Sequence, residues 1–159
     1  MAELKQFKCL NDLKKALSEL GDYRARPAIR GKDVNLYPER LDGKYRTVMG
    51  VRICDYKFSV DEKMVLPDRQ MGLSFSATWS NLEFVFGMYA KRAKKKPVDV
   101  YWVLSEADLP LGLKFEEDNN SSGHYFLTVT EPMRIEQLVD KLKMVSYRMS
   151  IIKDGGRAI

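Results

Sequence analysis

The stretch LPLGLKFEEDNNSSGHYFLTVTEPMRIEQLVDKLKMV, residues 109–145, carries the clearest run of structural signals in this chain. Its apolar beginning leads into a short strand, and an acidic and polar turn is expected at 116–122. The residues HYFLTV at 124–129 then predict a second strand, because β-branched and aromatic side chains follow directly on the turn.

The rest of this stretch predicts an amphipathic helix over about 132–149. Thr130 can cap the helix, and Pro132 suits its first turn. The inner face consists of apolar residues at helical spacing, which are Ile135, Leu138, Val139, Leu142 and Val145.

Two further helices are expected outside this stretch. Apolar residues spaced by three and four predict one helix over about 4–20. A second helix, over about 80–96, is introduced by Ser80 and Glu83, whose spacing is that of a capping box.

Strands are expected over a β-rich part at 34–79 and again within 98–129. In the first part, VNLY at 34–37 is one candidate, and the alternation over 52–60 indicates a strand with one drier face. Residues 22–33, which contain Pro27 and Gly31, are expected to form a loop, and 150–159 a flexible tail.

This order of elements favours one α+β domain spanning residues 1–159. The strands are short and few connections are long enough to be crossover helices, so the sheet should be largely antiparallel or split. There is no G-x-G-x-x-G or phosphate-loop motif, which leaves the familiar nucleotide-binding folds without their signature.

Composition is that of a folded soluble protein, with 45% hydrophobic and 31% charged residues. The net charge of +5 favours an anionic partner such as nucleic acid, a nucleotide or an acidic protein. Basic residues concentrate at 24–32 and at 91–96. The second cluster is either a solvated helix end, complementing the helix dipole, or a phosphate-binding group.

Several other site types find no support in the sequence. The two cysteines, Cys9 and Cys54, are too few for a disulfide framework and are expected to be reduced, buried thiols. Together with one histidine they cannot complete a structural zinc site, so no metal is expected. No apolar run approaches the roughly 20 residues of a membrane span, and no signal peptide is evident. A cytoplasmic setting is therefore expected.

Two segments contain candidate functional side chains. In GLSFSA at 72–77, Ser74 and Ser76 share one face of a strand because side chains alternate. His124, the single histidine, begins the strand 124–129 and shares a face with Phe126. Each segment has an ordinary structural explanation as well, namely a solvated strand face for the serines and a polar surface position for His124.

These motifs together resemble a known family. The Leu-Pro-x-Gly-Leu entry, the acidic turn, the His-Tyr strand and the Pro-Met before the helix, about fifty residues after GLSFSA, are similar to small cytoplasm-acting toxins of the bacterial type VI secretion system. The similarity covers roughly 34–145 and is best over 109–145. It implies an ADP-ribosyltransferase-like fold with a split, largely antiparallel sheet and flanking helices.

The resemblance also implies which residues act. It assigns catalytic roles to His124 and Ser74, and it implies NAD contacts for Ser76, Tyr125, Tyr37 and Arg40. Arg40 stands later than the arginine of the family, after Pro38 and Glu39. The Gln/Glu-x-Glu pair that is usual in ADP-ribosyl transfer is missing from the chain.

The implied activity is a cytoplasm-acting toxin that uses NAD as substrate, for transfer or hydrolysis. Its implied partner is a cognate immunity or antitoxin protein, and export would proceed through a contractile apparatus without a signal peptide. Two alternatives remain. One is a basic RNA-directed toxin or RNA-binding module that holds phosphates through 24–32 and 91–96, and the other is a non-catalytic interaction module.

Overall fold

The computed structural model describes residues 9–29, 46–94, 98–148 and 150–152. Within these ranges the main sheet has six strands, each antiparallel to its neighbours. Their spatial order is β11 (Ser150–Ile152), β7 (Val98–Ser105), β1 (Tyr23–Ile29), β6 (Leu73–Ser76), β9 (His124–Val129) and β8 (Leu113–Glu117).

Three α-helices and two small sheets complete the described part of the chain. The helices are α1 (Leu10–Glu19), α2 (Trp79–Ala93) and α3 (Ile135–Tyr147), and a short 3-10 turn spans Glu106–Asp108. One small sheet has three strands, in the order β10 (Met133–Arg134), β5 (Met64–Leu66) and β4 (Lys57–Phe58). The other is the hairpin of β2 (Thr47–Val48) and β3 (Val51–Arg52).

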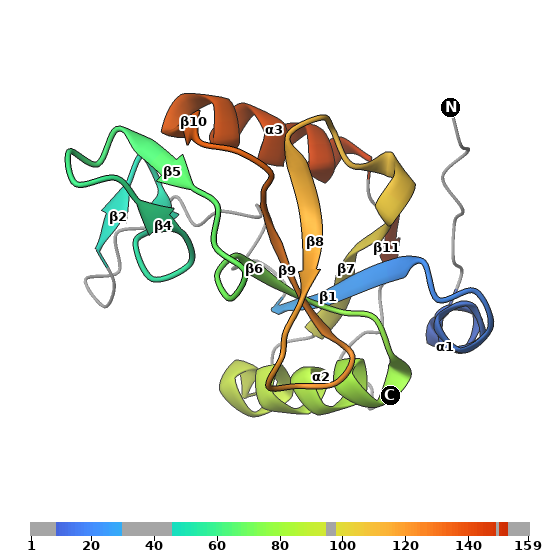
Figure 1. The fold of residues 1–159 in the computed structure, drawn as a ribbon. Coiled ribbons are helices and arrows are strands. Elements are labelled where there is room, and N and C mark those ends of the chain that lie inside the picture. The colour runs from blue at the N-terminus through green and yellow to red at the C-terminus, as the bar shows by residue number, and fades with distance from the viewer. Residues whose placement is uncertain (1–8, 30–45, 95–97, 149, 153–159) are drawn as a thin grey trace.

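The main sheet is a middle layer between two apolar cores. Helix α3 lies on one face, whereas α1 and α2 lie on the other, and β2–β5 project to one side (Figure 1). Leu127 and Leu138 belong to the core under α3, and Leu82 and Ala25 to the core under α2. Full burial of one leucine side chain stabilises a fold by roughly 1.5–3 kcal/mol, so the two cores hold the sheet from both sides.

This architecture confirms the α+β class with a largely antiparallel sheet. Strand β9 has the predicted bounds, and α3 buries the predicted face, which comprises Ile135, Leu138, Val139, Leu142 and Val145. The described helices include none that is long and apolar enough to cross a membrane.

The loop expected over 22–33 is wrong for its first part, because residues 23–29 form β1 in the interior of the sheet. Pro27 misled the prediction, since proline is rare in inner strands. The registered pairing of β1 with β6 is limited to Ala25 and Ser76, and Pro27 lies beyond it, opposite Val100 of β7. The strand therefore tolerates a missing N–H at that position.

The single strand expected over 52–60 is also wrong. The chain turns after β3 and resumes as β4, with hydrogen bonds closing the turn from Asp55 N to Arg52 O at 3.1 Å. Tyr56 is buried, but Cys54 and Val60 are exposed, so no drier face exists. Cys9 is exposed as well, which corrects the expectation of buried thiols.

Three element ends differ from expectation. Helix α2 is capped by Thr78, not Ser80, because the Thr78 hydroxyl accepts from Asn81 N at 3.3 Å. Helix α3 begins after Arg134, whose N–H donates to Gln137 Oε1 at 3.0 Å, so Thr130 is not its cap. Residues 150–152 form the edge strand β11 rather than a tail. The strand predicted at 34–37 lies outside the described residues.

Candidate functional site

The candidate site lies on the α2 face of the main sheet, where β6, β9 and β8 run side by side. Ser76 is directly opposite His124, and Ser74 is opposite Phe126. Cross-strand partners point to the same face of a sheet, and Ala25, the β1 partner of Ser76, belongs to the core under α2. The sheet therefore brings the three predicted residues Ser74, Ser76 and His124 together on one face.

The two serines differ in access to solvent. Ser74 is exposed, whereas Ser76 retains 2% of its accessible surface. The Ser76 hydroxyl donates to Asn81 Oδ1 at 2.6 Å, within the first turn of α2. Ser76 is thus already paired and helps to join α2 to the sheet, while Ser74 is free to meet a ligand.

His124 is held on one side of its ring. Its Nδ1 lies 2.9 Å from Asp118 Oδ2, and the two side chains are only 15% and 13% exposed. The ring also meets the Phe126 ring edge-on, with centroids 4.9 Å apart. Among the described residues Nε2 has no recorded hydrogen bond, so this nitrogen is the ring atom that remains for a ligand.

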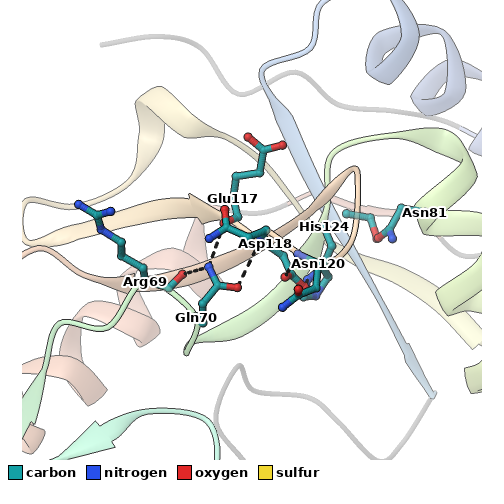
Figure 2. Close-up of polar contacts among 9 residues, drawn as sticks. Arg69, Gln70, Asn81, Glu117, Asp118, Asn120 and His124 are labelled. Carbon is teal, nitrogen blue, oxygen red and sulfur yellow. Dashed lines mark hydrogen bonds and ion pairs between the residues drawn. The ribbon is translucent and has the colours of Figure 1, made fainter.

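The polar turn before β9 is closed by hydrogen bonds around Asp118 (Figure 2). Asp118 N donates to His124 O at 2.9 Å, and Asp118 Oδ1 accepts from Asn120 N at 2.8 Å. Gln70, from the loop before β6, accepts from Asn119 N at 3.3 Å and donates to Glu117 O at 3.4 Å. Hydrogen bonds within the turn and to Gln70 outside it therefore hold the turn in one conformation.

Glu116 adds a carboxylate to the same face. It lies on β8 opposite Phe126, so Glu116, Phe126 and Ser74 form one row across three strands. Its side chain is 25% exposed and forms an ion pair with Lys114 at 3.2 Å. Relative to His124 it occupies a diagonal position, for which separations of about 7–8 Å are typical.

Of the other predicted contact residues, only Tyr125 lies within the described ranges, and it does not join this group. Tyr125 points to the opposite face, where Arg24 stacks on its ring at 4.2 Å. An aromatic that stacks on a ligand beside His124 would have to be Phe126 instead. Tyr37 and Arg40 lie outside the described residues.

The described arginine and lysine residues of the two basic clusters include both buried and exposed side chains. Arg24 is 4% exposed and donates to Gly21 O, Tyr23 O and Glu106 Oε2, at 3.1 to 3.3 Å, so it belongs to the interior. Lys91, Arg92 and Lys94 at the end of α2 are exposed. Among the residues described by the structure, no cluster of histidine, cysteine and carboxylate side chains could hold a metal ion.

Comparisons with protein-family models, with curated proteins and with solved structures found no match to this chain. The family resemblance thus depends on the motifs at 72–76 and 109–145.

Sequence reasoning selected the serines and His124 as candidates and did not select Glu116 or Asp118. Both were expected in a polar turn, which is correct for Asp118, whereas Glu116 belongs to β8, which continues to Glu117. The available signal was the pattern Glu-x-Asp, which puts two carboxylates on one side of an extended chain. Their relation to His124 depends on the register of β8 against β9.

Proposed function

We propose that this protein is an NAD-consuming enzyme, an ADP-ribosyltransferase-like toxin that acts in the cytoplasm of a bacterial target cell. The observation that carries the proposal is the presence of three polar groups on one face of adjacent strands. Ser74, His124 and Glu116 share one face of β6, β9 and β8. Glu116 supplies the kind of carboxylate that the motif comparison lacked, on the same face as the predicted serine and histidine.

The chemistry of NAD cleavage fits these groups. When the bond between nicotinamide and ribose breaks, its electron pair leaves with nicotinamide and positive charge develops on the ribose. A carboxylate such as Glu116 stabilises that charge most effectively where water is scarce. A new bond to the same ribose carbon is then formed by water or by a nucleophile of the target molecule, which loses a proton on attack.

The remaining groups would orient the substrate. The exposed Ser74 hydroxyl can hydrogen-bond a ribose hydroxyl, and His124 Nε2 can accept from a second hydroxyl. Phe126, which lies opposite Ser74 and packs against the His124 ring, offers an aromatic surface beside both. In this proposal the antiparallel sheet with helices on both faces is a variant of the ADP-ribosyltransferase-like fold, and a cognate immunity protein protects the producing cell.

The test is loss of NAD in the presence of purified wild-type protein and three variants, Ser74→Ala, His124→Ala and Glu116→Gln. Loss of an electrostatic stabiliser costs about 10²–10³-fold in rate, so Glu116→Gln should be the most damaging. The matched control is Glu117→Gln, since Glu117 is the neighbouring carboxylate and pairs with Tyr125, which faces the other way. This control should keep wild-type activity.

Wild-type NAD consumption by both Glu116→Gln and His124→Ala would exclude the proposal. An equal loss in Glu117→Gln would show that the face is assigned wrongly. The same variants can be expressed in bacteria, where toxicity should follow the order of their NAD consumption.

A second candidate, an RNA-directed toxin, is favoured by the exposed cations at the end of α2. Arg24, which belongs to the first expected cluster, is however buried in the interior and is not available to bind phosphates. Binding to phosphates through Lys91, Arg92 and Lys94 would weaken steeply with added salt. RNA affinity that is independent of salt, or unchanged after reversal of these three charges, would exclude this alternative.

A further inference from the structure

We propose that Asp118 is a positioning residue that selects the tautomer of His124 and turns Nε2, as a hydrogen-bond acceptor, toward the candidate site. The inference rests on the proposed function only for the use that is made of Nε2. The positioning itself concerns the side chains of the folded protein and can be measured without substrate.

In the contact between Asp118 and His124, the imidazole ring is the hydrogen-bond donor. An ionised carboxylate accepts hydrogen bonds but cannot donate them, so the contact of 2.9 Å between Asp118 Oδ2 and His124 Nδ1 requires the proton on Nδ1. In the neutral imidazole the other nitrogen, Nε2, then carries the lone pair. Without a partner on Nδ1, a histidine side chain in water favours the opposite tautomer, with the proton on Nε2.

The Asp118 carboxylate is held by hydrogen bonds at both of its oxygens. Asp118 Oδ1 is engaged by Asn120 N at 2.8 Å while Oδ2 meets His124. The carboxylate cannot rotate without breaking one of these bonds. Its backbone is tied to the same histidine, because Asp118 N donates to His124 O at 2.9 Å. Both ends of the residue therefore hold His124 in one place.

Neighbouring residues support the pair of Asp118 and His124. The imidazole ring packs edge-on against Phe126, at an interplanar angle of 84°. The turn is braced by Gln70, which bonds to Asn119 N and Glu117 O on either side of Asp118 (Figure 2). The low exposure of both side chains limits competition from water for these hydrogen bonds.

These contacts predict an inverted tautomer in Asp118→Asn. The amide oxygen can keep the bond from Asn120 N, while the amide nitrogen, now a donor, faces His124 Nδ1. Nδ1 must then accept, and the ring proton moves to Nε2. The variant keeps the size and shape of the side chain, so the turn should remain folded.

The experiment is the measurement of ring nitrogen chemical shifts by long-range proton–nitrogen NMR at a pH where the imidazole is neutral. The chain contains a single histidine, so the spectrum reports His124 alone. Wild type should show the proton on Nδ1 and Asp118→Asn should show it on Nε2. Asp118→Ala should give a mixture that favours Nε2.

The matched control is Asp61→Asn. Asp61 also organises a turn, since its Oδ1 accepts from Ser59 Oγ at 2.7 Å and from Lys63 N at 3.1 Å. This turn joins β4 and β5, away from the main sheet. The same chemical change there should leave the His124 tautomer as in wild type.

Wild type with its proton on Nε2, or an Asp118→Asn variant with the wild-type tautomer, would overturn the inference. An equal shift in Asp61→Asn would overturn it too, because the effect would then be a general loss of folding. NAD consumption is scored separately. An inverted tautomer with full activity would remove His124 from the proposed mechanism and still establish that Asp118 positions it.

Discussion

Asp55 lies in the turn between β3 and β4, where burial and charge act on it in opposite directions. Burial raises the pKa of its carboxyl, and the nearby cations Arg26 and Arg52 offset only part of this effect. Ionisation of this carboxyl is therefore less favourable in the folded protein than in the unfolded chain. This residue lowers the stability of the protein when it carries its charge.

Asp55→Asn should consequently gain stability relative to wild type as the pH rises. The folded-state pKa lies above the unfolded value of about 3.9, so the stabilising effect of the protonated carboxyl is complete below that pH and lost as the pH rises through the folded-state pKa. Urea unfolding at pH 3 and pH 7 measures the difference. A constant difference between variant and wild type would contradict the prediction.

For Asp61→Asn, the stability difference from wild type should change with pH in the opposite direction. The hydrogen bond from Ser59 holds the pKa of the Asp61 carboxyl below its ordinary value. Its contribution is therefore present above the unfolded pKa and is lost as the pH falls through the folded-state pKa. As the pH rises, the free energy of unfolding of wild type should increase relative to Asp61→Asn. In the same experiment it should decrease relative to Asp55→Asn.

At the scale of elements, the start of α2 and the turn before β9 depend on each other. Gly123 has φ of +79°, and Ala77 N donates to its carbonyl at 2.8 Å. A Cβ atom at Gly123 would lie 2.2 Å from the hydroxyl oxygen of Thr78, which caps α2. The turn that carries Asp118 thus fits against the helix N-terminus only because residue 123 has no side chain.

This fit predicts a coupled pair of substitutions. Thr78→Ala should cost about 0.5–2 kcal/mol through loss of the cap. Gly123→Ala should cost more than the roughly 1–2 kcal/mol of a left-handed non-glycine residue, because it also clashes with Thr78. The double variant should be less destabilised than the sum, since Thr78→Ala removes the nearest clashing atom. Urea unfolding of all four proteins measures the coupling, and strict additivity would contradict it.

At the scale of the whole molecule, one sheet separates two cores and should make them unfold together. Leu82 lies in the core under α2 and Leu138 in the core under α3, both fully buried. Leu82→Ala and Leu138→Ala should each cost about 2–5 kcal/mol. In each variant, far-UV circular dichroism and tryptophan fluorescence should report the same urea midpoint. Separate midpoints would show that the two layers are independent.

Local patterns in the sequence were sufficient for α3 and β9. In α3 the apolar spacing matches the helical period, and the buried face follows from that spacing. In β9 the β-branched and aromatic residues directly after a polar turn indicate the strand, whose last three residues are all buried. Alternation along a strand also predicts that Ser74 and Ser76 share one face, whereas their meeting with His124 depends on the register of β6 against β9.

Other features depended on partners distant in the chain. The sequence of β1 is polar and contains a proline, which predicts a loop. It forms a strand because β7 and β6 pair with it on either side. Glu116 reads as part of a turn, and it joins Ser74 and His124 only through the register of β8 and β9. The sequence by itself determined which segments are helix or strand where their own periodicity was strong. Only the tertiary structure decided the inner strand and the carboxylates of the site, because cross-strand pairing is a non-local interaction.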